Sequence, residues 1–135
     1  MTKGRMLALC LAAAIAAIPA TAHHSFDGSF DRNKQVTLTG TVTEFSFGEP
    51  HSYFKLAVAG SDGTTQSWHV ETTSAHGLAE RGWTPQSIKA GEKLSVQGWP
   101  ARDGKTYMRL SSLSHADGSA VGLWLPPGPT PLASR

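Results

Sequence analysis

Six histidines are the residues of this chain whose type could support the most chemistry, and they occupy positions 23, 24, 51, 69, 76 and 115. An imidazole nitrogen is a common ligand for copper, zinc and nickel ions. The single cysteine, Cys10, lies in an apolar run near the N-terminus, so residues 23–135 hold no thiol that could act as a nucleophile, form a disulfide or ligate a metal. The histidines therefore direct the search for a function towards metal binding.

The adjacent pair His23 and His24 directly follows an A-x-A cleavage signal at residues 20–22. Cleavage before His23 would give it a free α-amine, which can chelate one ion together with its own ring nitrogen in the tetragonal geometry of Cu(II). Cleavage two residues earlier would leave Thr-Ala-His, and a histidine third from a free amine is also a square-planar Cu(II) or Ni(II) site. We expect metal ligation by His23, His24 and the turn residue His51; the alternative is an exposed terminus without a ligand.

Residues 1–22 are typical of a secretory signal peptide. Lys3 and Arg5 precede an apolar run over residues 7–18, which is too short to cross a bilayer as a helix, and Pro19 ends the run. The residue before Cys10 is leucine rather than a small residue, which argues against lipidation. We predict a periplasmic or secreted protein with no stable membrane anchor after processing; an uncleaved N-terminal anchor is the alternative.

Removal of this leader also changes the charge balance. The whole chain has 12 basic and 10 acidic residues, so without Lys3 and Arg5 the basic residues equal the acidic ones. Binding of nucleic acid rests largely on an excess of Lys and Arg that neutralises phosphates. We therefore expect no nucleic acid among the partners, and instead a metal ion, a small ligand or an envelope protein.

The elements that must position the candidate residues are short strands separated by turns. Alternating apolar residues predict strands over 35–47, 52–58, 65–71, 93–98 and 106–112, with a short helix over 75–81. A change of apolar parity predicts a bulge near Thr43 and Glu44, and an inward-facing Gly40 predicts a close backbone approach. This order predicts an all-β, OB-fold-like five-stranded barrel with one helix between its third and fourth strands; a small β-sandwich is the alternative.

One domain is expected, an OB-like barrel over residues 23–125, followed by a Pro-rich and disordered tail over 126–135. In an OB-like barrel the loops between strands 1 and 2 and between strands 4 and 5 flank the binding face. His51 ends the first of these loops. The side chains that we expect on the ligand face are aromatic or basic: Tyr53, Lys55, Trp99, Arg102 and Tyr107.

No catalytic pattern is evident in the sequence. No glycine-rich loop leads into a helix, and there is no G-x-S-x-G motif. We interpret Glu44, Glu49 and Glu71 as solvated strand and turn residues, and His69 as a surface histidine. We predict a protein that is not an enzyme and has no cofactor other than copper; an oxidative copper enzyme, which needs an open coordination position, is the weakest alternative.

The chain also resembles a family of small exported bacterial proteins described as a domain of unknown function. The resemblance rests on motifs spread over residues 22–118: A-H-H-S-F, G-T-V-T-E-F, P-H, W-H-V-E, R-G-W, G-E-K-L-S-V-Q-G, P-A-R-D-G and a late D-G. It implies an envelope location and an OB-like barrel, and it brings no established activity. Glu49 stands where asparagine is usual, and Trp99 where histidine is frequent, so a metal site that used the latter position would be lost here.

Together these observations predict an exported OB-like binding protein that holds copper or a similar metal through its N-terminal histidines. The alternative is a structural or interaction module of the cell envelope that binds no metal and uses the barrel face.

Overall fold

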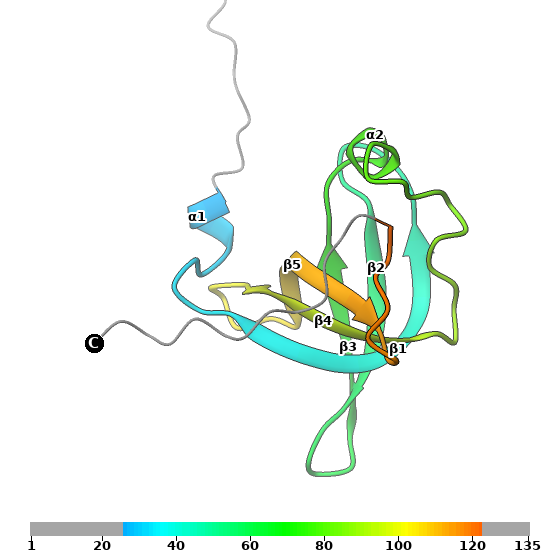
Figure 1. The fold of residues 1–135 in the computed structure, drawn as a ribbon. Helices are drawn as coiled ribbons and strands as arrows, with labels where there is room; N and C mark the ends of the chain where they lie inside the picture. The colour runs from blue at the N-terminus through cyan, green and yellow to red at the C-terminus, as the bar shows by residue number, and fades with distance from the viewer. Residues whose placement is uncertain (1–25, 123–135) are drawn as a thin grey trace, which may run out of the picture.

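Five strands close into a small barrel in the computed structural model, which describes residues 26–122 (Figure 1). The strands neighbour one another in the order β1-β2-β3-β5-β4, and β4 pairs back to β1. The predicted OB-fold-like barrel is confirmed, as is the short helix between β3 and β4. In chain order the elements are α1 Phe26–Ser29, β1 Val36–Ser46, β2 Tyr53–Ala59, β3 Thr65–Glu71, α2 Ala75–Ala79, β4 Lys93–Pro100 and β5 Tyr107–His115.

The long strand β1 belongs to both halves of the barrel. Its first part, residues 36–41, pairs with β4, and its second part, residues 41–46, pairs with β2. The register shifts between Val42 and Glu44, which is the predicted bulge, and a bulge bends the strand that carries it. Gly40 lies at the crossing, where a Cβ would collide with the carbonyl oxygen of Ala57. The bend and the missing side chain together let one strand serve both halves.

A short parallel pairing completes the barrel. Residues 69–71 of β3 pair with residues 107–109 of β5, whereas all the other strand pairs are antiparallel. Inside the closed wall, the fully buried apolar side chains come from every strand, and α2 adds Leu78: Val42, Phe54, Leu56, Val70, Leu78, Leu94, Val96, Met108 and Leu113. Burial of these side chains is the main source of stability of the domain.

The helix α2 lies over one end of the barrel. The Ser74 hydroxyl caps it by accepting a hydrogen bond from the backbone N–H of Gly77 at 3.1 Å. The helix is shorter than the predicted range 75–81, because Glu80 is its C-cap and Gly82 has a positive φ of 75°. Trp83 then turns into the barrel end, where its Nε1–H donates to the carbonyl oxygen of Val121 at 3.1 Å.

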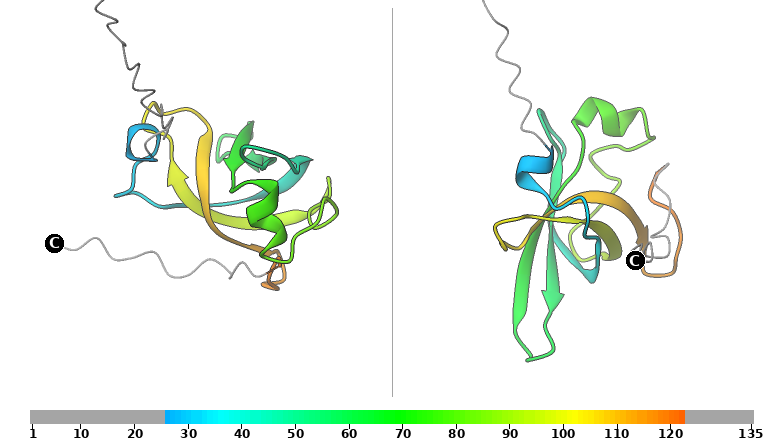
Figure 2. Two further views of the ribbon diagram at one scale, coloured as in Figure 1. Left: turned by 90° about the horizontal axis from the view of Figure 1, so that it is seen from above. Right: turned by 90° about the vertical axis from the view of Figure 1, so that its left-hand side faces the viewer.

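A second short helix, α1, was not predicted. The segment that contains it lies along the β4–β5 loop (Figure 2). Phe30 forms an isolated bridge with Ala101, and the backbone N–H of Arg102 donates to the carbonyl oxygen of Ser29 at 3.0 Å. The Arg102 side chain adds a third link, since its Nε donates to the carbonyl oxygen of Asp27 at 2.7 Å. These bonds fix the start of the described chain beside the β4–β5 loop.

Several predictions about the chain ends fall outside the described residues. The signal peptide 1–22, the pair His23 and His24 and the tail 126–135 lie beyond residues 26–122, so they stay predictions, as do the bounds of the domain. Between residues 26 and 122, no helix combines the length and the apolar character needed to cross a membrane.

Candidate functional site

The strand register places polar side chains of three strands in two rows on the outside of the barrel. Phe54, Val70 and Met108 are aligned across β2, β3 and β5 and are fully buried. Because side chains alternate along a strand, the residues on either side of these three point outward. We call the six outward residues the outer face; its rows are Lys55, His69 and Tyr107, and Tyr53, Glu71 and Arg109.

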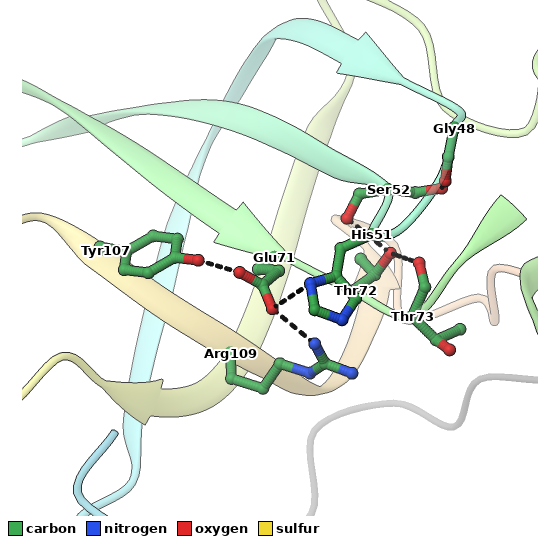
Figure 3. A network of polar contacts seen from close by, with 8 residues as sticks. All are labelled: Gly48, His51, Ser52, Glu71, Thr72, Thr73, Tyr107 and Arg109. Atoms are coloured by element: carbon green, nitrogen blue, oxygen red, sulfur yellow. Dashed lines mark hydrogen bonds and ion pairs between the residues drawn. The ribbon is translucent and has the colours of Figure 1, made fainter. Parts of the chain in front are cut away.

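Glu71 lies in the middle of the second row and binds three side chains (Figure 3). Its Oε1 is 2.6 Å from Arg109 Nη1 and 3.0 Å from His51 Nδ1, and its Oε2 accepts from the Tyr107 hydroxyl. The Glu71 side chain is only 13% exposed. The interpretation of Glu71 as a solvated strand residue is therefore wrong, because this carboxylate is largely buried and held by three donors.

The contact with Glu71 orients the ring of His51. Since Nδ1 faces the carboxylate, the neutral ring carries its proton on Nδ1 and keeps a lone pair on Nε2. The His51 side chain is 44% exposed, so part of the ring is accessible from solvent. A carboxylate that binds the far nitrogen in this way orients metal-binding histidines and makes them more basic.

His51 opens onto a groove with a volume of about 450 Å³, which we call the His51 groove. One wall comes from the N-terminal segment, through Phe26 and Phe30, and the other walls come from the β1–β2 turn and the outer face. The groove therefore joins His51 to the first described residue of the chain. Its lining residues are Phe26, Ser29, Phe30, Pro50, His51, Glu71, Tyr107 and Arg109.

His69 lies between two tyrosines in the first row of the outer face. Its ring stacks on Tyr53 with the centroids 4.4 Å apart, and it meets the Tyr107 ring at a steep angle at 4.9 Å. Burial lowers the pKa of His69 below its ordinary value of 6.5, although the negative charge of Glu71 acts in the opposite direction. His69 is thus a half-buried packing residue in which burial favours the neutral ring, rather than the surface histidine that the sequence suggested.

This lowered pKa predicts that protonation of His69 destabilises the fold. The unfolded chain takes up the proton near pH 6.5, above the pKa of the folded state, so stability is present above pH 6.5 and is lost as the pH falls towards the folded pKa. Thermal melts between pH 7.5 and pH 5 should show a steeper fall of Tm for the native protein than for His69→Gln. His76→Gln, which replaces an exposed histidine of α2, is the control and should follow the native curve; parallel curves for all three proteins would contradict the expectation.

The five residues predicted for the ligand face lie in two different parts of the molecule. Tyr53, Lys55 and Tyr107 belong to the outer face, where Tyr53 and Lys55 both bind the carboxylate of Glu44. Hydrogen bonds lower the pKa of Glu44; the larger effect comes from the Lys55 ammonium and the smaller one from the Tyr53 hydroxyl.

The other two predicted residues contact the N-terminal segment. Trp99 meets the ring of Phe26 edge to face with the centroids 5.2 Å apart. Arg102 binds the backbone of Asp27 and lines an open cavity with His69 and Lys105. Arg102 therefore holds the N-terminal segment in place, and it also lines the cavity with its charge.

The predicted metal ligands are only partly within the described residues. His51 is there, on its groove, whereas His23 and His24 precede residue 26. In the part of the chain that the structure describes, no three or more His, Cys, Asp or Glu side chains group so as to hold a metal ion. A metal site at His51 would thus need ligands from the N-terminal pair.

Solved structures with a similar barrel include single-stranded DNA-binding proteins and the N-terminal domain of PriB. A mitochondrial single-stranded DNA-binding protein of S. cerevisiae, Rim1, is 12% identical with a TM-score of 0.46, over 62% of this chain and 93% of that one. The N-terminal domain of PriB from Thermoanaerobacter tencongensis is 19% identical with a TM-score of 0.42, over 62% and 97%. A small single-stranded DNA-binding protein of Streptomyces coelicolor is 19% identical with a TM-score of 0.43, over 61% and 90%.

These similarities correct the prediction that excluded nucleic acid as a partner. That prediction rested on a neutral net charge, and single-stranded DNA-binding proteins are among the solved structures with this barrel. At these identities the likeness concerns the fold, and it assigns no ligand to this chain.

Sequence comparison places the chain in a family without assigning it an activity. No curated protein matches it. Residues 11–109 match the profile described as "Family of unknown function (DUF6152)". The resemblance to a family of unknown function is confirmed at that level, and the chain belongs to this family.

Proposed function

We propose that this protein is an exported barrel that binds a copper-type ion at the mouth of the His51 groove, with His51 Nε2, His23 and His24 as ligands. The observation that carries the proposal is the ring of His51, which Glu71 holds by its Nδ1 and which lines the same groove as Phe26. Export is part of the proposal, because the α-amine of His23 becomes a ligand only after the leader has been removed.

Chain length brings the N-terminal pair within reach of this groove. Phe26 is anchored by ring contacts with Phe30 at 5.4 Å and with Trp99 at 5.2 Å. Two peptide units span at most about 7 Å, so His24 starts within that distance of a residue in the groove wall, whatever conformation it adopts. His23 and its amine follow one unit further on.

The Glu71 carboxylate supports a cation at His51 Nε2 chiefly by orienting the ring, because Arg109 offsets part of its negative charge. Glu71 places a negative charge on the far side of the ring, and hydrogen bonds from Tyr107 and Arg109 hold that carboxylate in position. Imidazole and amine nitrogens bind Cu(II) more tightly than they bind most other divalent metal ions. The proposed ligands are thus all nitrogen donors, and Glu71 orients His51 without itself being a ligand.

Cu(II) titration by calorimetry tests the proposal on protein recovered from the export compartment, with its N-terminus identified by mass spectrometry. We expect binding tighter than micromolar, a loss of at least about 100-fold in the double variant His23→Ala/His24→Ala, and a loss of about tenfold or more in His51→Ala. His76→Ala, an exposed histidine outside the groove, is the matched control and should bind as the native protein does. Micromolar or weaker binding that the double variant leaves unchanged would sink the proposal.

A second candidate is a structural or interaction module of the cell envelope that binds no metal. A continuous run of rings favours it: Phe26, Phe30, Tyr107, His69 and Tyr53 follow one another with centroid distances between 4.4 and 5.4 Å. All of these rings except the buried Phe30 are partly exposed, and aromatic rings supply a rigid contact area for a partner. A photo-crosslinking residue at position 55, on the outer face, should then trap an envelope protein both with and without a copper chelator; trapping that the chelator abolishes would favour the metal-binding function.

A further inference from the structure

Arg109 also lines a groove other than the one onto which His51 opens. This groove has a volume of about 410 Å³, and we call it the arginine groove. The chain segments on either side of α2 supply Thr73 and Arg81, β4 supplies Trp99 and β5 supplies Arg109. A volume of this size is sufficient for a small organic molecule.

The ionisable side chains that line the arginine groove are both cationic. They are Arg81 and Arg109, and no Asp or Glu is among the lining residues. The hydroxyl-bearing residues Thr73 and Ser111 also line it. A guanidinium presents its donors as a planar fork that matches a carboxylate or a phosphate, and such charge-assisted hydrogen bonds are stronger than neutral ones. The polar part of the lining therefore suits an anion.

Arg109 is held in place before any ligand arrives. Its Nη1 binds Glu71 Oε1 at 2.6 Å, and its side chain is 25% exposed. Glu71 is itself held by the Tyr107 hydroxyl and by His51 Nδ1, so the partner that positions Arg109 is fixed as well. A side chain that is already ordered loses less entropy on binding a ligand.

Two aromatic rings complete the groove. Trp99 and Phe26 line it and meet edge to face at 5.2 Å. The indole of Trp99 is half-buried, so part of its surface remains open to contact another ring. Aromatic contacts of this kind add to the energy of a charge pair and select planar ligands.

We infer that the arginine groove binds a small aromatic anion, a planar ring that carries a carboxylate or a phosphate. The anionic group lies between Arg81 and Arg109, and the ring lies against Trp99. This inference does not rest on metal binding at His51, because the two grooves share only Phe26 and Arg109 among their lining residues and the ligand of the arginine groove is an anion.

The test uses metal-free protein and two probes, benzoate and phenyl phosphate, in calorimetric titrations at low salt. Phenol, which has the ring without the charge, and inorganic phosphate, which has the charge without the ring, are the reference compounds. We expect both aromatic anions to bind more tightly than phenol, and the tighter of the two identifies the anionic group. Arg81→Gln should weaken both probes by about tenfold, since it removes one charge-assisted contact.

Two further variants separate the parts of the site. Like Arg81→Gln, Lys89→Gln removes one positive charge, but from an exposed residue outside the groove. It should leave the affinity for both aromatic anions within about twofold of the native value. Trp99→Ala should weaken benzoate and phenyl phosphate without changing the affinity for inorganic phosphate. Circular dichroism verifies that each variant is folded. The inference is overturned if neither aromatic anion binds more tightly than phenol, or if Arg81→Gln and Lys89→Gln have equal effects.

Discussion

Replacing Glu71 with alanine is expected to lower the free energy of unfolding by about 3 kcal/mol, because it leaves Arg109 without its partner in a largely buried position. The same change frees the His51 ring, since the Nδ1 contact disappears. Loss of a carboxylate that orients a metal-binding histidine typically costs about 10–100-fold in metal affinity. Chemical denaturation measures the first effect, and Cu(II) calorimetry measures the second.

The barrel supplies a matched control for this variant. Glu44 also accepts hydrogen bonds from a tyrosine and a cation, here Tyr53 and Lys55, but its side chain is 43% exposed and it does not touch His51. Glu44→Ala should therefore cause a far smaller loss of stability and leave copper affinity as it is. If the two variants lose stability equally, the burial of the Glu71 network contributes nothing. If copper affinity survives Glu71→Ala, the carboxylate does not orient the ligand.

A second large effect is expected for Gly98→Ala. A Cβ at position 98 would collide with the carbonyl oxygen of Arg109 and lie 3.1 Å from its carbonyl carbon, so the β4–β5 pair must separate locally. Forcing extra atoms into a closely packed backbone costs typically about 1–3 kcal/mol. The displaced residue is Arg109 itself, so the variant should also loosen the contact with Glu71. Denaturant unfolding measures the loss of stability, and chemical shifts of the Arg109 guanidinium report the local change.

Gly48→Ala is the appropriate comparison for Gly98→Ala. Nothing lies within 4 Å of a Cβ at position 48, and its φ is not positive. An alanine there should be neutral or should stabilise by up to about 1 kcal/mol, because it restricts the unfolded chain. A loss at position 48 as large as the loss at position 98 would mean that the collision with the Arg109 backbone is not the cause.

The strands and their inward residues were predictable because they depend on local patterns. The alternation of Phe54 with polar neighbours, and the parity change near Glu44, are properties of neighbouring residues and were found in the sequence. The end of α2 was predicted two residues too late, because its last turn depends on the cap at Glu80. The helix α1 was missed, since Phe26 and Phe30 are ordered by the distant residues Trp99 and Tyr107.

The Glu71 network could not be found from local patterns. Its partners come from the β1–β2 turn and from β5, and β5 lies beside β3 through a parallel pairing whose register no turn specifies. Outward parity alone suggested a solvated carboxylate for Glu71. The predictable signal was the position of His51 in the loop that flanks the face, and the structure adds the carboxylate that orients its ring. The copper prediction itself depends on His23 and His24 and awaits the titration.

The parallel pairing of β3 with β5 also sets an order for folding. As the chain is synthesised, β1, β2 and β3 can form an antiparallel meander, but its open edges find no partners until β4 and β5 have emerged. The wall closes only when residues 107–109 of β5 reach residues 69–71 of β3. Contacts so distant in sequence form slowly. Strands β1 to β3 must therefore wait for β5 before they can become part of a closed barrel.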